Sequence, residues 1–439
     1  MRKLTGTKLV ILNAGATYVR MFLCAGLALF SSRWILAALG EVDFGLYAVI
    51  AGVMGFLSFL TGAMAGSAQR HFAFSIGQGN VEEVNKWFNA SLAIHFCLAV
   101  LLVAIGLPFG RYMINHVLTI PAERLAVCHK VFLCTLVTVV FRVLIVPYTG
   151  MFTAKQRIFE LALYQTVQVL FMFCFAYFLT MLEGDRLMIY AIGVTVFSLL
   201  VASIETLRCS LCFSECKLKF KFQSRLAYCK ELLSFGGWSL FGSLGAVGSN
   251  QIMAFIINIF CGPRINASFG IANQVSGQAN GIAQGLFNAI APEITSSEGR
   301  GDRERVINLS LLASKFSVLM LCLVLIPFMI EIDTILGLWL KEVPQYTAVL
   351  CRIVVVAFLI DKLTIGYIVA VTANGKIAGY QATLGGALIC APLIAWVLFK
   401  TGCGVAVSVG SALLITRTLC ALGRVWWVRR LMGVSMRLW

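Results

Sequence analysis

Twelve long apolar runs constrain this chain more than any other feature of its sequence. A helix needs about 20 mostly apolar residues to cross a bilayer core, and charged residues or Pro and Gly separate runs of that length here. The 439 residues are 60% hydrophobic and 12% charged, whereas soluble domains are about 45–50% apolar and about 25% charged. We exclude a water-soluble enzyme and predict an all-α polytopic membrane protein with spans at residues 9–31, 44–67, 86–109, 126–151, 159–181, 187–207, 233–259, 266–290, 307–330, 347–372, 378–399 and 403–427.

The basic residues predict the orientation of these spans. The chain has 35 Lys and Arg against 19 Asp and Glu, a net charge of +16. With both termini on the cytoplasmic side, the inner segments hold roughly 21 basic residues and the outer segments about seven, as expected from the positive-inside rule. Most of the net charge therefore indicates topology. Every connection is short, which leaves no room for a soluble catalytic domain, and we expect no catalytic residues.

An internal repeat predicts two bundles of six helices. At an offset of 219 residues the chain matches itself in one register over about 70 residues. The matches include Asn89 with Asn308, Ser91 with Ser310, Pro108 with Pro327, Tyr148 with Tyr367 and Thr153 with Thr372. An even number of spans gives both halves the same orientation, as in some alternating-access transporters. We expect an N-terminal bundle over 1–207, a basic cytoplasmic linker over 208–232 and a C-terminal bundle over 233–439.

Five charged residues lie at hydrocarbon depth in the predicted spans. Each costs about 2.5 to 3.5 kcal/mol on insertion scales, or on the order of 12 to 18 kcal/mol together, unless it faces a partner or water. Helical spacing places polar residues on the same faces. We predict that these faces line a polar cavity between the bundles, and the candidate substrate-binding residues are Arg20, Arg142, Asp361, Lys362 and Arg417, with Asn13 and Thr17 beside Arg20 and the amide face Asn273, Asn280, Gln284 and Asn288.

Two alternatives stay open at these positions. Arg142 and Asp361 are equivalent in the repeat, so they either bind substrate or form a structural ion pair. The amide face either binds sugar hydroxyls or holds helices together. Arg352 lies near the end of its span and is expected to reach the outer surface.

The charges inside the predicted spans favour an anionic ligand. Four embedded bases against one embedded acid, Asp361, leave about +3 in a medium of low dielectric constant. This charge suits a diphosphate or an acidic sugar better than a cationic drug.

Other common sites are not expected. The histidines do not cluster and are interpreted as loop or interfacial residues. Cys209, Cys212, Cys216 and Cys229 have a spacing loosely like that of a zinc site, but no His is near them. We expect no metal, no nucleic acid and no cofactor. No phosphate-binding loop for ATP is present, and coupling to an ion gradient or to the membrane potential stays open.

Short motifs in a fixed order add a resemblance over nearly the whole chain. They include Asp43-Phe44-Gly45-Leu46-Tyr47, Ala68-Gln69-Arg70-His71-Phe72, Phe269-Gly270-Ile271-Ala272-Asn273, Ile335-Leu336-Gly337-Leu338-Trp339-Leu340 and Ala373-Asn374-Gly375-Lys376-Ile377. In these motifs the chain resembles the O-antigen type of oligosaccharide-lipid flippase, in the polysaccharide transport branch of the multidrug/oligosaccharidyl-lipid/polysaccharide exporter superfamily. Members of that superfamily are similar in fold to multidrug exporters.

The resemblance implies a function. Such a protein would move an undecaprenyl-diphosphate-linked oligosaccharide, a precursor of O-antigen or capsule, from the cytoplasmic to the periplasmic leaflet of the bacterial inner membrane. Its partners would be this lipid-linked oligosaccharide and membrane lipids, with a polysaccharide polymerase and chain-length proteins as candidates. An ion-coupled drug or metabolite exporter on the same fold is the alternative. A polymerase or ligase would carry a long external loop, and a scaffold or channel would not depend on the embedded charges.

Overall fold

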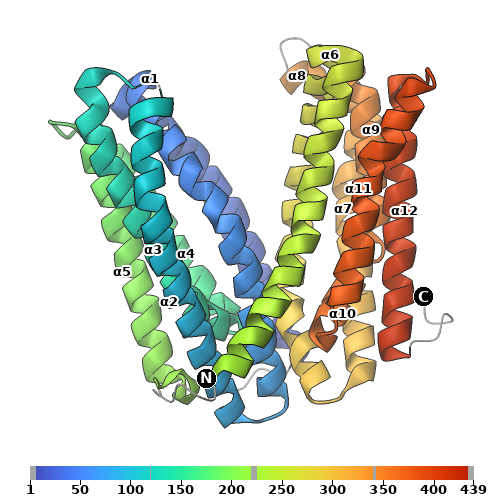
Figure 1. Ribbon diagram of the computed structural model, residues 1–439, viewed down its shortest axis with the longest axis horizontal. Coiled ribbons are helices and arrows are strands. Elements are labelled where there is room, and N and C mark those ends of the chain that lie inside the picture. The colour runs from blue at the N-terminus through green and yellow to red at the C-terminus, as the bar shows by residue number, and fades with distance from the viewer. Residues whose placement is uncertain (1–5, 119, 219–224, 340–342, 434–439) are drawn as a thin grey trace. The chain divides into compact units, whose positions relative to one another are not determined.

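The described part of the chain is helical throughout. The computed structural model describes residues 6–118, 120–218, 225–339 and 343–433, and these ranges contain helices, turns and no strand (Figure 1). They fall into two compact units, Met1–Ser234 and Phe235–Trp439. The fold is that of an all-α polytopic membrane protein.

Unit 1 contains five long helices and the beginning of a sixth. The long helices are α1 (Gly6–Gly77), α2 (Val81–Tyr112), α3 (Leu125–Ala154), α4 (Ile158–Leu179) and α5 (Arg186–Cys212). Its core is aromatic: Phe72, Phe88 and Phe152 are fully buried where α1, α2 and α3 meet. Helix α6 (Arg225–Gly299) begins in this unit, where Leu232 belongs to the same core, and continues into unit 2.

Unit 2 contains the rest of α6 and six further helices. These are α7 (Arg303–Ile330), α8 (Ile332–Trp339), α9 (Thr347–Lys362), α10 (Gly366–Asn374), α11 (Ala378–Lys400) and α12 (Val405–Met432). Its core is mainly aliphatic and includes Ile257, Leu336 and Leu350, none of which is accessible to solvent.

The predicted spans agree with the helices. Eight helical segments of the described chain are long and apolar enough to cross a membrane, or nine if α9 and α10, which meet at a 44° bend, form one broken span. The three remaining predicted runs, 9–31, 44–67 and 266–290, fall in the two halves of α1 and in the second half of α6. All twelve runs are therefore helical.

The backbone supports the internal repeat. Helix α1 bends at Gly40, with φ 75°, and α6 bends at Gly262, with φ 81°. Positive φ recurs at three further pairs of positions about 220 residues apart. These pairs are Gly79 with Gly301, Gln156 with Gly375, and Gly184 with Gly402. Because few residues adopt this conformation, its recurrence in register is strong evidence that the two halves share one fold.

The segment predicted as a basic linker packs against unit 1 over its described residues. The Asn85 Nδ2 donates to the backbone oxygens of Glu215 and Lys217 at 2.6 and 2.7 Å. The Ser67 hydroxyl donates to the Leu232 carbonyl at 2.9 Å. Residues 219–224 of this segment lie outside the described ranges.

The interpretation of all four histidines as loop or interfacial residues is wrong for two of them. His71 and His95 are buried in α1 and α2, with 2% and 1% of their surface exposed. Each ring hydrogen-bonds through Nδ1 to the backbone oxygen four residues earlier, of Ser67 and Ser91, at 2.8 and 2.7 Å. This local bond satisfies one ring nitrogen and lowers the cost of burying the ring.

Candidate functional site

A polar cavity lies inside unit 1. Its volume is about 650 Å³, and helices α1, α3, α4 and α5 form its wall. The lining combines two guanidinium groups, one carboxyl, two carboxamides and several hydroxyls with apolar side chains. The polar and titratable lining residues are Arg20, Cys24, Ser31, Thr138, Arg142, Thr149, Gln165, Gln168, Tyr190, Ser198 and Glu205.

The two arginines of the cavity have no acidic partner among the described residues. Arg20 on α1 donates from Nη1 to Oε1 of Gln165 on α4 at 2.6 Å, which is a hydrogen bond to a neutral amide. Arg142 on α3 is exposed and forms no hydrogen bond or ion pair with the described residues. Both guanidinium groups therefore keep donors for an anion that enters the cavity.

Neutral polar groups complete the wall by bonding to one another. The Gln168 Nε2 donates to the Ser198 hydroxyl at 3.3 Å, across α4 and α5. The Thr138 hydroxyl donates to that of Thr195 at 3.1 Å, across α3 and α5. Amides and hydroxyls both donate and accept, so a ligand rich in hydroxyls can exchange partners with them.

Glu205 is a cavity residue that sequence reasoning missed. It lies on α5, lines the cavity and is only 5% exposed. The count of a single embedded acid is therefore wrong. The predicted span ends at residue 207, two residues after Glu205, whereas α5 continues to Cys212. The signal available in the sequence was an acidic residue inside an otherwise apolar run.

Unit 2 holds a separate cluster of charges around Asp361. The Asp361 Oδ1 lies 2.7 Å from Nη2 of Arg424 and 3.7 Å from Nη1 of Arg417, both on α12. The Nζ of Lys362, the next residue on α9, lies 3.8 Å from Oδ2. Three cations thus surround one carboxylate that is 7% exposed, and the ion pairs offset the cost of burying it.

This cluster lies where α9 ends and the span bends toward α10. The Arg424 Nη1 donates to the backbone oxygen of Asp361 at 2.7 Å and to the Thr364 hydroxyl at 3.3 Å. A helix end leaves carbonyl groups without intrahelical partners, and the guanidinium supplies one. The Lys362 Nζ donates to Oδ1 of Asn280 on α6 at 2.8 Å, which joins the amide face to the cluster.

The structure corrects the interpretation of Arg424, which is one of the roughly 21 basic residues that the sequence analysis counted in the inner segments. It is 6% exposed and makes the shortest contact to Asp361. Its position near the predicted end of the last span hid its role, because a long side chain there usually reaches the membrane surface. Arg352 does lie at the edge of its span, where it pairs with Asp333 at 2.9 Å.

The candidate residues divide between the two units. Unit 1 brings Arg20 and Arg142 to one cavity, and Thr17 is buried on the same helix as Arg20. The side chain of Asn13 lies outside the described residues. Unit 2 brings together Asp361, Lys362, Arg417 and Asn280, while Asn273 is half-buried on α6, and Gln284 and Asn288 are exposed there.

The proposed pairing of Arg142 with Asp361 joins residues of different units. Each unit is described by itself, so the approach of these two residues stays a prediction. Asp361 already has three cationic neighbours inside unit 2. Those neighbours fulfil the structural role that the alternative interpretation gave to Arg142.

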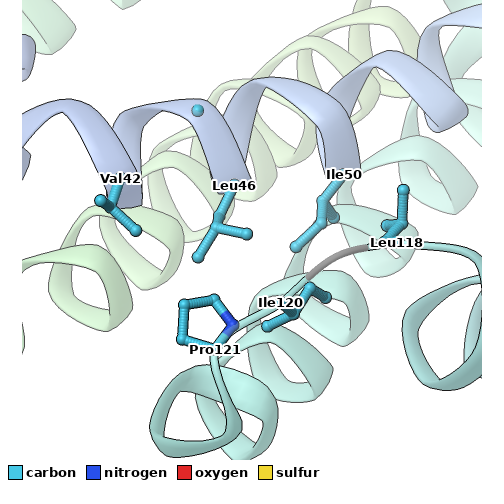
Figure 2. Close-up of a pocket in the computed structure, with 7 residues that line it drawn as sticks. Val42, Leu46, Ile50, Leu118, Ile120 and Pro121 are labelled. Carbon is cyan, nitrogen blue, oxygen red and sulfur yellow. The ribbon is translucent and has the colours of Figure 1, made fainter.

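A second pocket in unit 1 differs sharply from the polar cavity. Its volume is about 520 Å³, and Figure 2 shows apolar side chains of α1 facing those of the segment before α3. None of the described residues that line it carries a charge, so this part of the wall is suited to apolar groups. Its lining residues are Val42, Gly45, Leu46, Ile50, Leu118, Ile120 and Pro121.

The described cysteines and histidines form no metal centre. No group of three or more His, Cys, Asp or Glu side chains in the described ranges is arranged to hold a metal ion. Cys209 and Cys216 approach each other, with their Sγ atoms 3.4 Å apart, but Cys212 hydrogen-bonds to Arg208 instead.

Solved structures of transporters share this fold. A transporter of the MOP superfamily from Pyrococcus furiosus, whose binding pocket is described as having reverse polarity, aligns with a TM-score of 0.75 and 15% identity over 98% of this chain and 97% of its own. An outward-facing multidrug resistance transporter of the MATE family, in the same superfamily, aligns with a TM-score of 0.77 and 14% identity over 99% of both chains. At these identities the likeness establishes the fold alone.

The sequence of this chain is similar to one membrane protein and matches one protein family. The chain is 23% identical over 317 residues to the uncharacterised membrane protein EpsK of Bacillus subtilis, covering 71% of this chain and only 61% of EpsK. The family described as polysaccharide biosynthesis protein matches residues 16–298, well over half of the chain. The chain therefore belongs to the polysaccharide biosynthesis protein family, and its fold is that of a multi-pass membrane protein.

Proposed function

We propose that this protein is a transporter, namely a flippase for an undecaprenyl-diphosphate-linked oligosaccharide, a precursor of O-antigen or capsule. It would move the lipid-linked sugar from the cytoplasmic to the periplasmic leaflet of the bacterial inner membrane by alternating access. Both termini would be cytoplasmic, and an ion gradient or the membrane potential would supply the energy. A polysaccharide polymerase and chain-length proteins are the proposed partners.

The unit 1 cavity is the observation that carries this proposal. The barrier to flipping is the head group, because its hydroxyls and diphosphate lose their hydration in hydrocarbon, whereas the polyprenyl tail stays in lipid. Arg20 and Arg142 provide charge-assisted donors for the diphosphate. Gln165, Gln168 and Ser198 provide neutral partners for sugar hydroxyls. The volume of about 650 Å³ is in the usual range for ligand pockets.

Unit 2 would contribute the second part of the binding surface. In this proposal Lys362 and Arg417 add positive charge, and the exposed amides Gln284 and Asn288 of α6 bind further hydroxyls. Asp361 would set the geometry of the cations that surround it.

The alternative is an ion-coupled drug or metabolite exporter on the same fold. The solved relatives named above favour it through their fold. The guanidinium groups of the cavity oppose it for organic cations, because like charges at low dielectric constant repel strongly.

The test is complementation of a bacterial strain that lacks its own flippase and makes the corresponding lipid-linked sugar. We expect the wild-type chain to restore surface polysaccharide, and Arg20→Gln and Arg142→Gln to reduce it strongly at equal membrane levels. Arg33→Gln is the matched control, since Arg33 is an exposed arginine of α1 that does not line the cavity. Full restoration by both cavity variants, or resistance to organic cations without restored polysaccharide, would overturn the proposal.

A further inference from the structure

Glu205 is a buried carboxyl group for which the structure shows no partner. It is 5% exposed and lines the unit 1 cavity from α5. Among the described residues it makes no hydrogen bond or ion pair. Asp361 of unit 2 is buried to a similar extent, at 7% exposed, but it has three cations around it. Its charge is neutralised by these neighbours, whereas that of an ionised Glu205 would not be.

The titratable and charged groups around Glu205 come from three of the four helices that form the cavity wall. Helix α4 contributes only the neutral amides of Gln165 and Gln168. One turn further along α5, Arg208 does not line the cavity and pairs with Glu160 at 2.7 Å. The groups that share the cavity with Glu205 are Arg20 and Cys24 on α1, Arg142 on α3 and Tyr190 on α5.

An ionised carboxylate in this position is costly. The penalty for burying a charge reaches several kcal/mol unless a counter-ion and hydrogen bonds offset it. A proton bound to the carboxylate removes the charge. A metal ion fits poorly, because the cavity wall contains one carboxylate and two guanidinium groups, which repel a second cation.

We propose that Glu205 is a proton-binding site of the unit 1 cavity and that its protonation is linked to the binding of an anion there. With Glu205 protonated, the cavity carries the two positive charges of Arg20 and Arg142. When the carboxyl releases its proton to water, the carboxylate becomes an internal anion that lowers the positive potential of the cavity. Binding of a dianion therefore takes up a proton, and proton release favours dissociation.

This inference rests on the proposed function only for the identity of the anion. A diphosphate diester carries the same two charges at every pH near neutrality, since the group that titrates in a terminal phosphate is esterified. Any change of its affinity with pH then comes from a titratable group of the protein. The proton taken up at Glu205 would therefore be a property of the binding step itself, whatever supplies the energy for transport.

The first measurement is an infrared pH titration of the purified full chain in lipid nanodiscs, from about pH 5 to about pH 9. It follows the carbonyl band of protonated carboxyl groups in the wild type, in Glu205→Gln and in Glu160→Gln. We expect a band that disappears as the pH rises, that is present in the wild type and in Glu160→Gln, and that is absent in Glu205→Gln. Glu160 is the control because it is ion-paired on α4 and does not line the cavity.

The second measurement is calorimetric binding of a short-chain prenyl-diphosphate-linked sugar, in buffers that differ in ionisation enthalpy. The wild type and Glu160→Gln are expected to take up close to one proton per bound molecule at high pH and to bind more weakly there. Glu205→Gln, which imitates the protonated group, is expected to take up no proton and to keep the same affinity throughout.

The two measurements separate the possible failures. A carboxyl band that persists unchanged in Glu205→Gln overturns the proton site. A Glu205 band combined with pH-independent binding in the wild type overturns the linkage. A Glu205 band with no binding of the lipid-linked sugar at any pH supports the proton site and overturns the flippase function.

Discussion

The two units contain similar charged groups in opposite situations. In unit 1, Arg20 and Arg142 both line a cavity. Arg20 hydrogen-bonds only to a neutral amide, and Arg142 forms no hydrogen bond or ion pair with the described residues. In unit 2, Arg424 and Lys362 are 6% and 4% exposed and are directed onto Asp361. The first arrangement is available to a ligand, whereas in the second the contact of Arg424 with Asp361 stabilises the bend between α9 and α10. Of the unit 2 cations, only Lys362 and Arg417 are proposed to act on a ligand. Embedded charge therefore has different roles in the two units, although the units share one fold.

The net embedded charge is the same as the sequence suggested, but its distribution is different. Arg424 adds a base in unit 2 and Glu205 adds an acid in unit 1, and these two corrections cancel when Glu205 is ionised. The remaining positive charge is divided between the units. A count over the whole chain cannot show which of the bases an anion can reach.

The largest expected effect is on stability and comes from unit 2. Arg424→Leu leaves Asp361 without its nearest counter-ion, which should cost about 3 to 5 kcal/mol of unfolding free energy. The measurement is thermal unfolding followed with a thiol-reactive dye, since Cys420 and other cysteines are buried. The double variant Asp361→Leu with Arg424→Leu should recover most of the loss, because an apolar pair needs no compensation. A single variant as stable as the wild type would contradict the assignment.

The next effect is on ligand affinity and comes from unit 1. A charge-assisted hydrogen bond contributes about 1.5 to 3 kcal/mol, so Arg142→Gln should weaken binding of a lipid-linked diphosphate sugar about tenfold to a hundredfold. The measurement is calorimetry in nanodiscs, with thermal unfolding expected to stay near that of the wild type. Lys362→Met should weaken binding less, since Lys362 already bonds Asn280. Equal losses for the two variants would remove the distinction between the units.

A smaller effect on stability is expected at the bends of α1 and α6, which occupy equivalent positions in the two units. Gly40 has φ 75° and ψ 170°, and Gly262 has φ 81° and ψ 176°. This region is nearly restricted to glycine, so an Ala at either position should cost about 1 to 3 kcal/mol in strain. No other atom would obstruct the new methyl group at either site, so strain is the only expected cause. Thermal unfolding of Gly40→Ala and Gly262→Ala should show similar losses, and a large difference would contradict the structural equivalence of the halves.

The smallest effect is a pH dependence outside the membrane spans. Burial raises the pKa of Glu215, but hydrogen bonds from Lys155, at 2.5 Å, and from the backbone outweigh burial and hold its pKa below the usual value. Its contribution to stability is thus present above the usual pKa of a glutamate and is lost as the pH falls through the lowered pKa. Thermal unfolding of wild type and Glu215→Gln should differ by about 1 kcal/mol at most near neutrality. The difference should shrink in acid, and a difference that grows in acid would refute this sign.

The fold could be predicted because each helix carries its own signal. All twelve predicted runs are helical, and the repeat at an offset of 219 residues reappears as paired bends at Gly40 and Gly262. A membrane span must satisfy its backbone within itself. Length and apolar composition therefore suffice to locate it.

The site could be predicted only in part. Arg20 and Arg142, two of the predicted candidates, do line one cavity. On α1, Cys24 and Ser31 share a helical face with Arg20 and line the same cavity. Glu205 and Arg424 were missed because both lie near the ends of predicted spans, where a charged residue usually reaches the surface. An error of a few residues at a helix end, which is common, was enough to turn a buried group into an apparent surface group.

The sequence by itself determined the helices, their repeat and the presence of charge at membrane depth, since these properties depend on local composition and spacing. Only the tertiary structure decided which charges neutralise one another. It paired Asp361 with Arg424, sixty-three residues apart, and left Glu205 in a cavity with Arg20 and Arg142. The physical reason is that the interaction between charges depends on their distance and on the dielectric around them, and both are set by the packing of helices that are distant in the chain.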